Sequence, residues 1–152
     1  MPAELSPVYY TGLETGPLCL DFVPDPAGTF VKGDLVVVDV AVGDFDVCGA
    51  DPALIAGWAT GPKTGGFVTA EGKMPVEIIG ADVAYVMTAA GTLVATSLGK
   101  KFGVVKTAAG KWEVDIADTT ATRVVITSIL DLAAKRVEVH FLAATLQFNT
   151  GS

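Results

Sequence analysis

The residues of this chain that could carry out chemistry are few, and they match no familiar catalytic pattern. The single histidine, His140, lies in a stretch of alternating apolar and polar residues, which is typical of a strand. Histidine is the side chain most often used in general acid–base catalysis, and a nucleophile needs such a base within reach. None of the four serines lies in a nucleophile-elbow pattern. We therefore expect His140 to lie on the exposed face of a strand, and we expect that the chain is not an enzyme.

Carboxylates offer two further possibilities for chemistry. Asp44, Asp46 and Asp51 lie close together and could hold calcium, but they lack the spacing and the closing Glu of an EF-hand loop. Asp115 and Asp118 could act as the carboxylate pair of a glycosidase, although their spacing gives no support for this role. Glycine-rich phosphate loops are absent from the sequence. We therefore predict that Asp44, Asp46 and Asp51 occupy turns and that the chain has no catalytic residues, no metal site and no cofactor.

The two cysteines, Cys19 and Cys48, are 29 positions apart and form no CxxC motif. Each lies in an apolar stretch, where a free cysteine behaves as a small hydrophobic residue. We expect free, buried thiols in a reducing compartment, with a disulfide between them as the alternative.

The charge of the chain argues against two classes of partner. Ten basic and seventeen acidic residues give a net charge of −7 among 152 residues. Binding to nucleic acid depends on Lys and Arg that neutralise phosphates, and anionic membranes attract basic patches in the same way. We therefore expect no nucleic-acid partner and no membrane partner. The first seven residues lack the features of a signal peptide, so none is expected.

The hydropathy of the chain is high for a soluble domain. Hydrophobic residues make up 51% of the sequence and charged residues 18%, whereas an average soluble protein has about 25% charged residues. Either a generous β core accounts for this balance, or part of the exterior is covered by another protein. The longest uncharged run, residues 83–99, is expected to form two strands joined by a turn and not a membrane helix.

Short segments with alternating or continuous apolar residues predict an all-β fold. The expected strands are 35–42, 76–79, 83–87, 112–116, 123–127 and 137–141. Two short echoes, Thr88–Gly91 and Thr107–Gly110, predict hairpins, the first continuing into 92–94 and the second into 111–114. Short helical turns are possible after Asp51 and between Ser128 and Arg136. Seven to ten short strands are typical of a small β-barrel or β-sandwich.

The first 28 residues differ from the rest and are predicted to form an extended N-terminal arm, followed by a β-barrel or sandwich domain over residues 29–149. This segment contains five of the eight prolines and one apolar run, residues 18–23, that suits a strand. The arm either reaches a neighbouring subunit or folds back on its own domain. Aromatic anchors are common at interfaces, so the candidate interface residues are Tyr9, Tyr10, Phe22 and Trp58.

The order of strands and turns resembles a known family. The segments that carry the resemblance are Lys32–Val37, Leu54–Ala59, Lys73–Ile78, Gly99–Val104, Ala109–Asp115 and Arg136–Leu142. Their succession resembles the small β-barrel or β-sandwich decoration (cement) proteins that stabilise the heads of tailed bacteriophages. The resemblance implies a structural virion protein on the capsid exterior, a homotrimer that binds the major capsid protein and has no catalytic residues.

Two alternative functions remain open from the sequence. A phage tail or baseplate subunit would share the strand pattern but assemble into rings or tubes. A carbohydrate-binding β-sandwich would stack an exposed tryptophan on sugar, and Trp58 and Trp112 are the two tryptophans available. Trp112 alternates with Lys111 and Glu113 on the apolar face of its strand, so we expect it in the core.

Overall fold

The computed structural model describes residues 6–8, 19–62, 72–108 and 110–148, and these residues fold almost entirely as β-strands. They contain eleven strands, two short 3-10 helices and no α-helix, which confirms the predicted all-β class. In chain order the elements are β1 (Ser6–Val8), β2 (Cys19–Pro24), β3 (Leu35–Val38), β4 (Asp44–Val47), β5 (Gly57–Ala59), β6 (Met74–Ile78), β7 (Ala84–Ala90), η2 (Ala95–Ser97), β8 (Lys101–Ala108), β9 (Lys111–Asp115), β10 (Val124–Asp131), β11 (Arg136–Phe141) and η3 (Ala143–Thr145).

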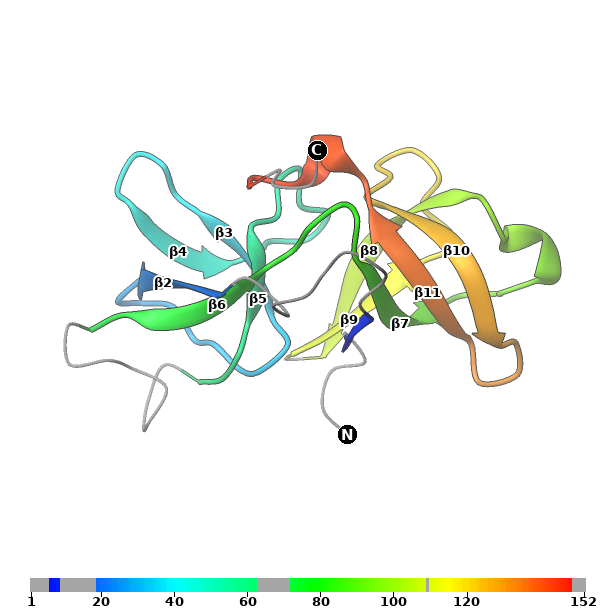
Figure 1. Cartoon of the computed structure of the whole chain (residues 1–152), viewed down its shortest axis with the longest axis horizontal. Coiled ribbons are helices and arrows are strands. Elements are labelled where there is room, and N and C mark those ends of the chain that lie inside the picture. Colours follow the sequence, from blue (N-terminus) through cyan, green and yellow to red (C-terminus); the bar gives the residue numbers. More distant parts are fainter. Residues whose placement is uncertain (1–5, 9–18, 63–71, 109, 149–152) are drawn as a thin grey trace.

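The first half of the chain forms a closed five-stranded barrel. Its strands follow the order β2-β4-β3-β5-β6, and β6 pairs back with β2. All neighbours are antiparallel except β2 and β4, which pair in parallel. This barrel lies on the left of Figure 1. Its own core is Phe30, Val36, Phe45, Ala59, Met74, Val76 and Ile78.

The second half forms another ring of five strands, on the right of Figure 1. Its order is β7-β11-β10-β8-β9, and a parallel pair between β9 and β7 closes the ring. β1 adds to β7 as a sixth, antiparallel strand, with Ser6 opposite Val86. The fully buried side chains of this ring include Tyr85, Met87, Trp112 and Phe141.

The two barrels have the same topology. Strands β2 to β6 correspond in order to strands β7 to β11. In each barrel the first strand pairs in parallel with the third and antiparallel with the fifth, while the second strand lies between the third and the fourth. The chain is therefore a tandem repeat of one five-stranded unit. The sequence echo does not mark this repeat, because both of its copies lie in the second barrel.

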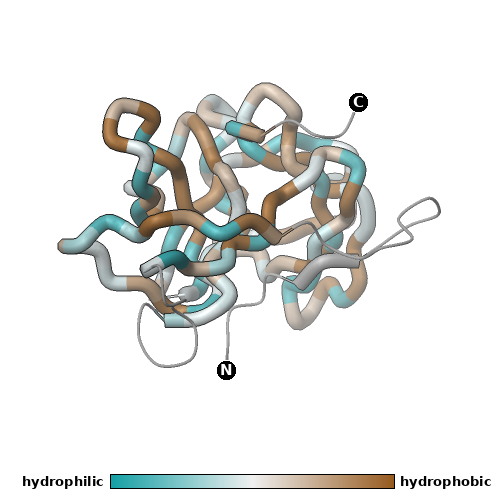
Figure 2. Tube along the Cα trace, turned by 60° about the vertical axis from the view of Figure 1, so that its left-hand side comes forward, coloured by the Kyte–Doolittle hydropathy of each residue, from teal (hydrophilic) through white to brown (hydrophobic). Residues whose placement is uncertain are grey.

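One large hydrophobic core extends through both barrels. Leu35, Ile55 and Trp58 of the first barrel belong to the same buried cluster as Tyr85 and Trp112 of the second. Hydrophobic segments run along the strands of both barrels and also occur in some outer loops (Figure 2). Because the core is continuous, the two barrels pack as one body.

The last described segment returns to the first barrel. The side-chain amide of Gln147 binds Val38 at both polar backbone groups: Oε1 accepts from the Val38 amide at 2.8 Å and Nε2 donates to its carbonyl at 2.7 Å. Beside it, Leu146 forms a parallel β-bridge with Ile55. The side chain of Gln147 therefore hydrogen-bonds to β3 as the backbone of a neighbouring strand would, an arrangement we call the Gln147 clamp.

Most of the expected strands are confirmed. Val137, Val139 and Phe141 are buried along β11, as the alternating pattern predicted. The hairpin over residues 107–111 joins β8 and β9, and Gly110 has the expected positive φ of 70°. The strand expected at residues 18–23 is β2.

Three local predictions are wrong. The strand expected over 35–42 ends at Val38, because the next residues form a turn that is described below. Residues 92–94 do not pair with β7; they enter a loop that carries η2, so the first predicted hairpin is absent. The possible helices are also absent: the residues after Asp51 form an irregular loop, and residues 132–135 form only the turn between β10 and β11, in which the Lys135 amide donates to the Leu132 carbonyl at 3.3 Å.

Most of the predicted N-terminal arm lies outside the described residues, so the arm and its boundary at residue 28 stay predictions. Its two described parts are strands, β1 against β7 and β2 within the first barrel. In the part of the chain that the structure describes, no helix has the length and hydrophobicity to cross a bilayer.

Candidate interaction surface

The four predicted interface residues occupy different environments. Tyr9 and Tyr10 lie outside the described residues. Phe22 is half-buried, and its ring contacts those of Phe45 and Phe148 at centroid distances of 6.0 and 5.7 Å. Trp58 is only 7% exposed, and its Nε1 donates to Glu77 Oε2 at 3.1 Å. Trp58 therefore lies in the core of this chain.

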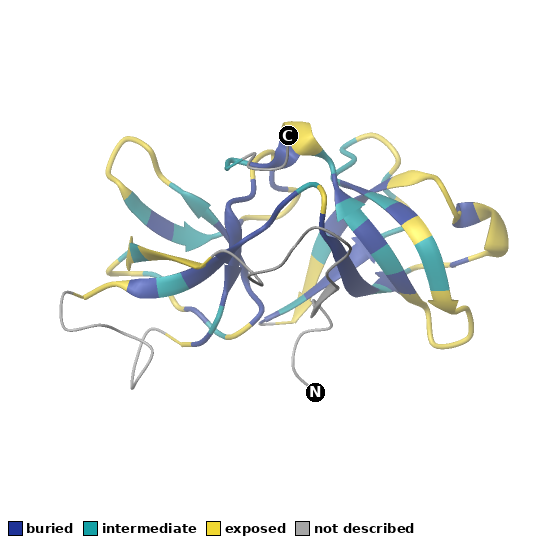
Figure 3. Cartoon of the chain, in the orientation of Figure 1, coloured by how far each residue is buried: buried dark blue, intermediate teal, exposed yellow. Residues whose placement is uncertain are grey.

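The apolar side chains that do remain exposed are mostly aliphatic residues of loops and turns. Figure 3 shows exposed residues at the β3–β4 hairpin, around η2 and at the β10–β11 hairpin. Neither tryptophan is among them, because Trp112 is completely buried. Among the residues whose burial the structure describes, the large exposed apolar ones are Leu20, Val23, Val40, Val42, Leu54, Val94, Leu98, Leu130 and Leu132.

The β3–β4 hairpin holds the two most exposed of these side chains. Val40 is 86% exposed and Val42 is 71% exposed. The Asp39 carboxylate accepts from the Ala41 amide at 2.9 Å, and the Asp39 carbonyl accepts from Val42 and Gly43 at 3.2 and 2.7 Å. This turn is tight, and sequence reasoning missed it because valines at alternate positions resemble a strand. An Asp followed four residues later by Gly was the signal that could have revealed it.

The loop around η2 is fixed in a similar way. The Val94 amide donates to Ser97 Oγ at 3.3 Å, and the Val94 carbonyl accepts from the Ser97 amide at 2.9 Å. Gly99, with a φ of 81°, donates to the Ile126 carbonyl of β10 at 2.8 Å. Ser97 is buried while Val94 and Leu98 are 45% and 52% exposed. The loop therefore presents two apolar side chains from a backbone anchored to β10.

Strand β2 presents a third surface. Cys19–Phe22 pair with β6 on one side, whereas the parallel pairing with β4 on the other side begins only at Val23. Among the described strands, none pairs with Cys19–Phe22 on this second side. Leu20 and Val23 are 36% and 44% exposed. β2 is thus a partly open edge that follows directly from the segment in which the arm is predicted.

Polar contacts fix how the two barrels sit against each other. Asp34, which is 1% exposed, accepts from the amides of Val31 and Gly110 at 3.1 and 3.0 Å. Its carboxylate also forms an ion pair with Lys106 of β8 at 3.1 Å. A buried carboxylate with two amide donors and a cation is well compensated for the loss of water. Asp34 thus ties the loop before β3 to the β8–β9 hairpin.

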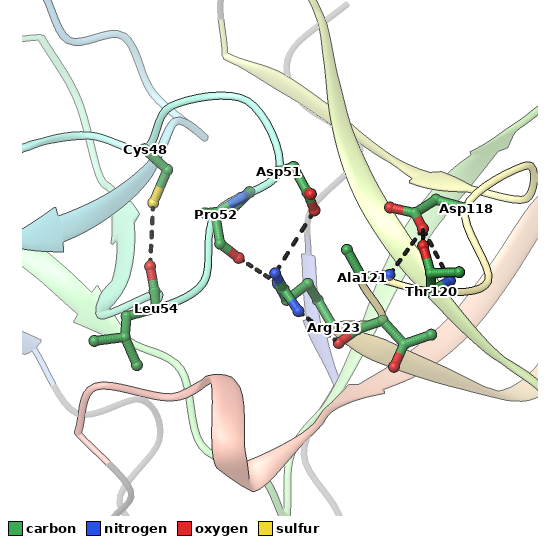
Figure 4. Close-up of polar contacts among 9 residues, drawn as sticks. Cys48, Asp51, Pro52, Leu54, Asp118, Thr120, Ala121 and Arg123 are labelled. Atoms are coloured by element: carbon green, nitrogen blue, oxygen red, sulfur yellow. Dashed lines mark hydrogen bonds and ion pairs between the residues drawn. The ribbon is translucent and has the colours of Figure 1, made fainter.

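Arg123 makes a second connection between the barrels (Figure 4). Its Nε donates to the carbonyl of Pro52 in the β4–β5 loop, and its NH2 group lies 3.6 Å from Asp51 Oδ1. Its NH1 group donates to the Thr122 carbonyl at 3.0 Å. The surfaces on the two barrels are therefore held in a fixed relation by Asp34 and Arg123 together.

Two of the carboxylates considered above for chemistry, Asp115 and Asp118, accept hydrogen bonds from backbone amides. Asp118 Oδ1 accepts from the amides of Thr120 and Ala121 at 3.0 and 2.9 Å (Figure 4), and these hydrogen bonds hold the pKa of Asp118 below its ordinary value. Asp115 Oδ1 accepts from the Ala117 amide at 3.1 Å. Within the described ranges, no three His, Cys, Asp or Glu residues lie together as metal ligands would. The expectation that Asp44, Asp46 and Asp51 occupy turns is wrong for Asp44 and Asp46, which lie within β4, whereas Asp51 lies in the β4–β5 loop as expected.

The remaining titratable groups are partly buried. His140 is half-buried, and its Nδ1 lies 2.9 Å from the Ala81 carbonyl, so it is less exposed than expected. Cys19 and Cys48 are free, but only Cys48 is buried, and burial raises the pKa of its thiol to about 12. Burial also raises the pKa of Glu77 to about 7, against the opposing effect of its hydrogen bond from Trp58.

No family model, curated protein or solved structure matches this chain. Function is therefore inferred from the geometry above. The arrangement suits contact with other proteins: rigid turns and an open strand carry exposed aliphatic side chains on two barrels held in a fixed relation.

Proposed function

We propose that this chain is a structural protein that decorates the outside of a tailed-phage head and stabilises the lattice of the major capsid protein. The observation that carries the proposal is the placement of exposed aliphatic side chains on rigid turns and on the open strand β2. Burying such side chains against a partner releases about 25 cal/mol for each Å² of apolar surface. Little ordering is needed on binding, because the turns are already fixed by their own hydrogen bonds.

We assign the contact with the capsid to β2 and the segment before it. An open strand edge accepts an extended segment of another protein through main-chain hydrogen bonds, and side chains at alternate positions add specificity. Leu20 and Val23 supply exposed apolar surface on this strand, and Phe22 lies between them. Tyr9 and Tyr10, the predicted anchors of the arm, precede the strand in the sequence. A homotrimer on the capsid exterior is part of this proposal.

The charge of the chain is consistent with this location. A net charge of −7 keeps the free protein soluble before assembly and gives it no attraction for packaged DNA. Additional subunits that bridge neighbouring capsid proteins add buried area at each joint, and this area resists the outward pressure of the genome.

Co-sedimentation with phage heads that lack the protein tests the proposal. Saturable binding at a fixed ratio to the shell protein is the expected result. The double variant Leu20→Asp with Val23→Asp should lose most of this binding while keeping its circular dichroism spectrum. Leu54→Asp is the matched control, because Leu54 is 45% exposed but lies in the β4–β5 loop.

The alternatives predict different results. Protein that stays at the top of the gradient, and forms rings or tubes alone, would instead indicate a tail or baseplate subunit. A glycan-binding module would bind sugars as an isolated protein. Both tryptophans that could stack on a sugar are buried, at 7% and 0% exposure, so this alternative has no indole face available.

A further inference from the structure

The two barrels share a topology but differ in charge. Residues 19–79, which contain the first barrel, carry nine acidic and three basic residues, a net charge of −6. Residues 80–148, which contain the second, carry six acidic and seven basic residues, a net charge of +1. The remaining charge of −2 comes from the two glutamates among residues 1–18. One end of the molecule is therefore strongly acidic and the other is not.

At each end of the molecule, exposed apolar residues lie next to charged residues of the sign that predominates in that barrel. We define the acidic tip as residues 39–44, where Val40 and Val42 lie between Asp39 and Asp44. Asp39 is exposed, Asp44 is half-buried, and neither forms an ion pair within the described part of the chain. The acidic tip thus combines two apolar side chains with two carboxylates that have no ion-pair partner among the described residues.

We define the basic loop as residues 94–101, where exposed Val94 and Leu98 precede Lys100 and Lys101. Both lysines are exposed, and in the described ranges neither is in an ion pair. No acidic residue occurs between 83 and 112. The basic loop therefore mirrors the acidic tip: two apolar side chains with two charges of the opposite sign.

We propose that the acidic tip of one copy binds the basic loop of a second copy. The two surfaces lie toward opposite ends of the long axis, on the left and on the right of Figure 1, so a single chain cannot join them to each other. Contact between two acidic tips would bring four aspartates together, and contact between two basic loops would bring four lysines together. Like charges at an interface oppose association, so the charge pattern selects the pairing of unlike surfaces.

This contact is head-to-tail, which means that each copy contributes a different surface to it. Such a contact closes into a ring if the rotation between copies permits, and otherwise continues as a filament. A closed ring of three is the predicted homotrimer. Two turns bury less area than a standard interface of about 1,600 Å², so we expect a weak association that strengthens at low ionic strength.

Two double variants remove the apolar contact without adding charge. Val40→Ser with Val42→Ser blocks the tip, and Val94→Ser with Leu98→Ser blocks the loop. Leu20→Ser with Leu54→Ser is the matched control, since both residues are exposed and lie in neither surface. All six side chains are at least 36% exposed, so the variants are expected to fold, as circular dichroism checks.

Sedimentation velocity over a range of protein concentrations at low salt measures the self-association. The wild type and the control should associate, and each blocked variant should associate at least about tenfold more weakly. A one-to-one mixture of the two blocked variants should form a dimer and nothing larger, because only the intact tip of one and the intact loop of the other remain. Raising the salt concentration should weaken all of these associations.

Three results would overturn the proposal: a wild type that is monomeric at every concentration, blocked variants that associate like the control, or a mixture that does not form the dimer. The measurement contains no capsid, so capsid binding is tested separately, and only the homotrimer is shared with the proposed function. Leu20 and Val23, which test capsid binding, lie outside both self-association surfaces.

Discussion

The buried carboxyl of Glu77 makes the stability of this protein depend on pH near neutrality. Glu77 is 6% exposed, and burial raises its pKa from the ordinary value of 4.5 to about 7. The folded state binds this proton more tightly than the unfolded state does. Ionisation of Glu77 therefore leaves the free energy of unfolding unchanged below pH 4.5, lowers it progressively between pH 4.5 and pH 7, and lowers it by a constant amount above pH 7. The difference between the two pKa values corresponds to about 3 kcal/mol at full ionisation.

Between pH 5 and pH 8 this linkage removes about 2–3 kcal/mol from the free energy of unfolding. Glu77→Gln removes the titrating group while its amide oxygen can still accept from Trp58 Nε1. We expect the variant to lose this part of the pH dependence and to be more stable than the wild type at pH 8. Urea unfolding followed by tryptophan fluorescence at several pH values measures the effect.

Asp21→Asn is the control for this measurement, because Asp21 lies on the neighbouring strand β2 with an exposed side chain. It should keep the pH dependence of the wild type. If Glu77→Gln loses stability between pH 5 and pH 8 as steeply as the wild type does, then Glu77 is not the group responsible, and the reasoning from its burial is wrong.

Three further predictions concern the fold. Gly57→Ala should destabilise the protein by about 3 kcal/mol or more in urea unfolding, because the added Cβ would lie 2.1 Å from the Glu77 carbonyl oxygen; an effect below about 1 kcal/mol would contradict this close approach. Asp34→Ala should lower the free energy of unfolding by about 2–4 kcal/mol, because the Gly110 and Val31 amides lose their acceptor. Lys106→Met should lower it clearly less, because Asp34 keeps both amide donors. In the native protein at neutral pH, Ellman's reagent should label Cys19 and reach Cys48 only after denaturant is added, because Cys48 is 5% exposed and its pKa is raised to about 12. Rapid labelling of two thiols in the native state would contradict the burial of Cys48.

Alternation along single strands could be predicted from the sequence. Trp112 of β9 was expected in the core and is completely buried, and the alternation around His140 matches the buried apolar residues of β11, because a half-buried strand repeats every two residues. The same rule wrongly placed Val40 and Val42 in a strand. β3 ends at Val38, and the carboxylate and carbonyl of the next residue, Asp39, accept hydrogen bonds that form a turn. A local pattern does not distinguish a strand from a turn that happens to alternate.

The repeat of the barrel could not be predicted, because it lies in the pairing of distant strands. β2 pairs with β6 and β7 with β11, and neither pairing leaves a local signal. The candidate surface was missed for a related reason. Aromatic residues such as Trp58 were proposed as anchors on their type alone, but Trp58 is buried by contacts and a hydrogen bond to Glu77 that only the fold supplies.

The Gln147 clamp on Val38 has a consequence for the order in which the protein folds during synthesis. The first barrel leaves the ribosome well before the second, yet the two hydrogen bonds on Val38 come from a residue 109 positions later in the chain. β1 is also made well before its partner β7. β1 therefore gains its partner only when β7 has been made, and Val38 gains its last two hydrogen bonds only when residue 147 has been made. A ribosome stalled before residue 147 would therefore display a first barrel whose strand pairings can all form but whose Val38 lacks its two hydrogen bonds from Gln147.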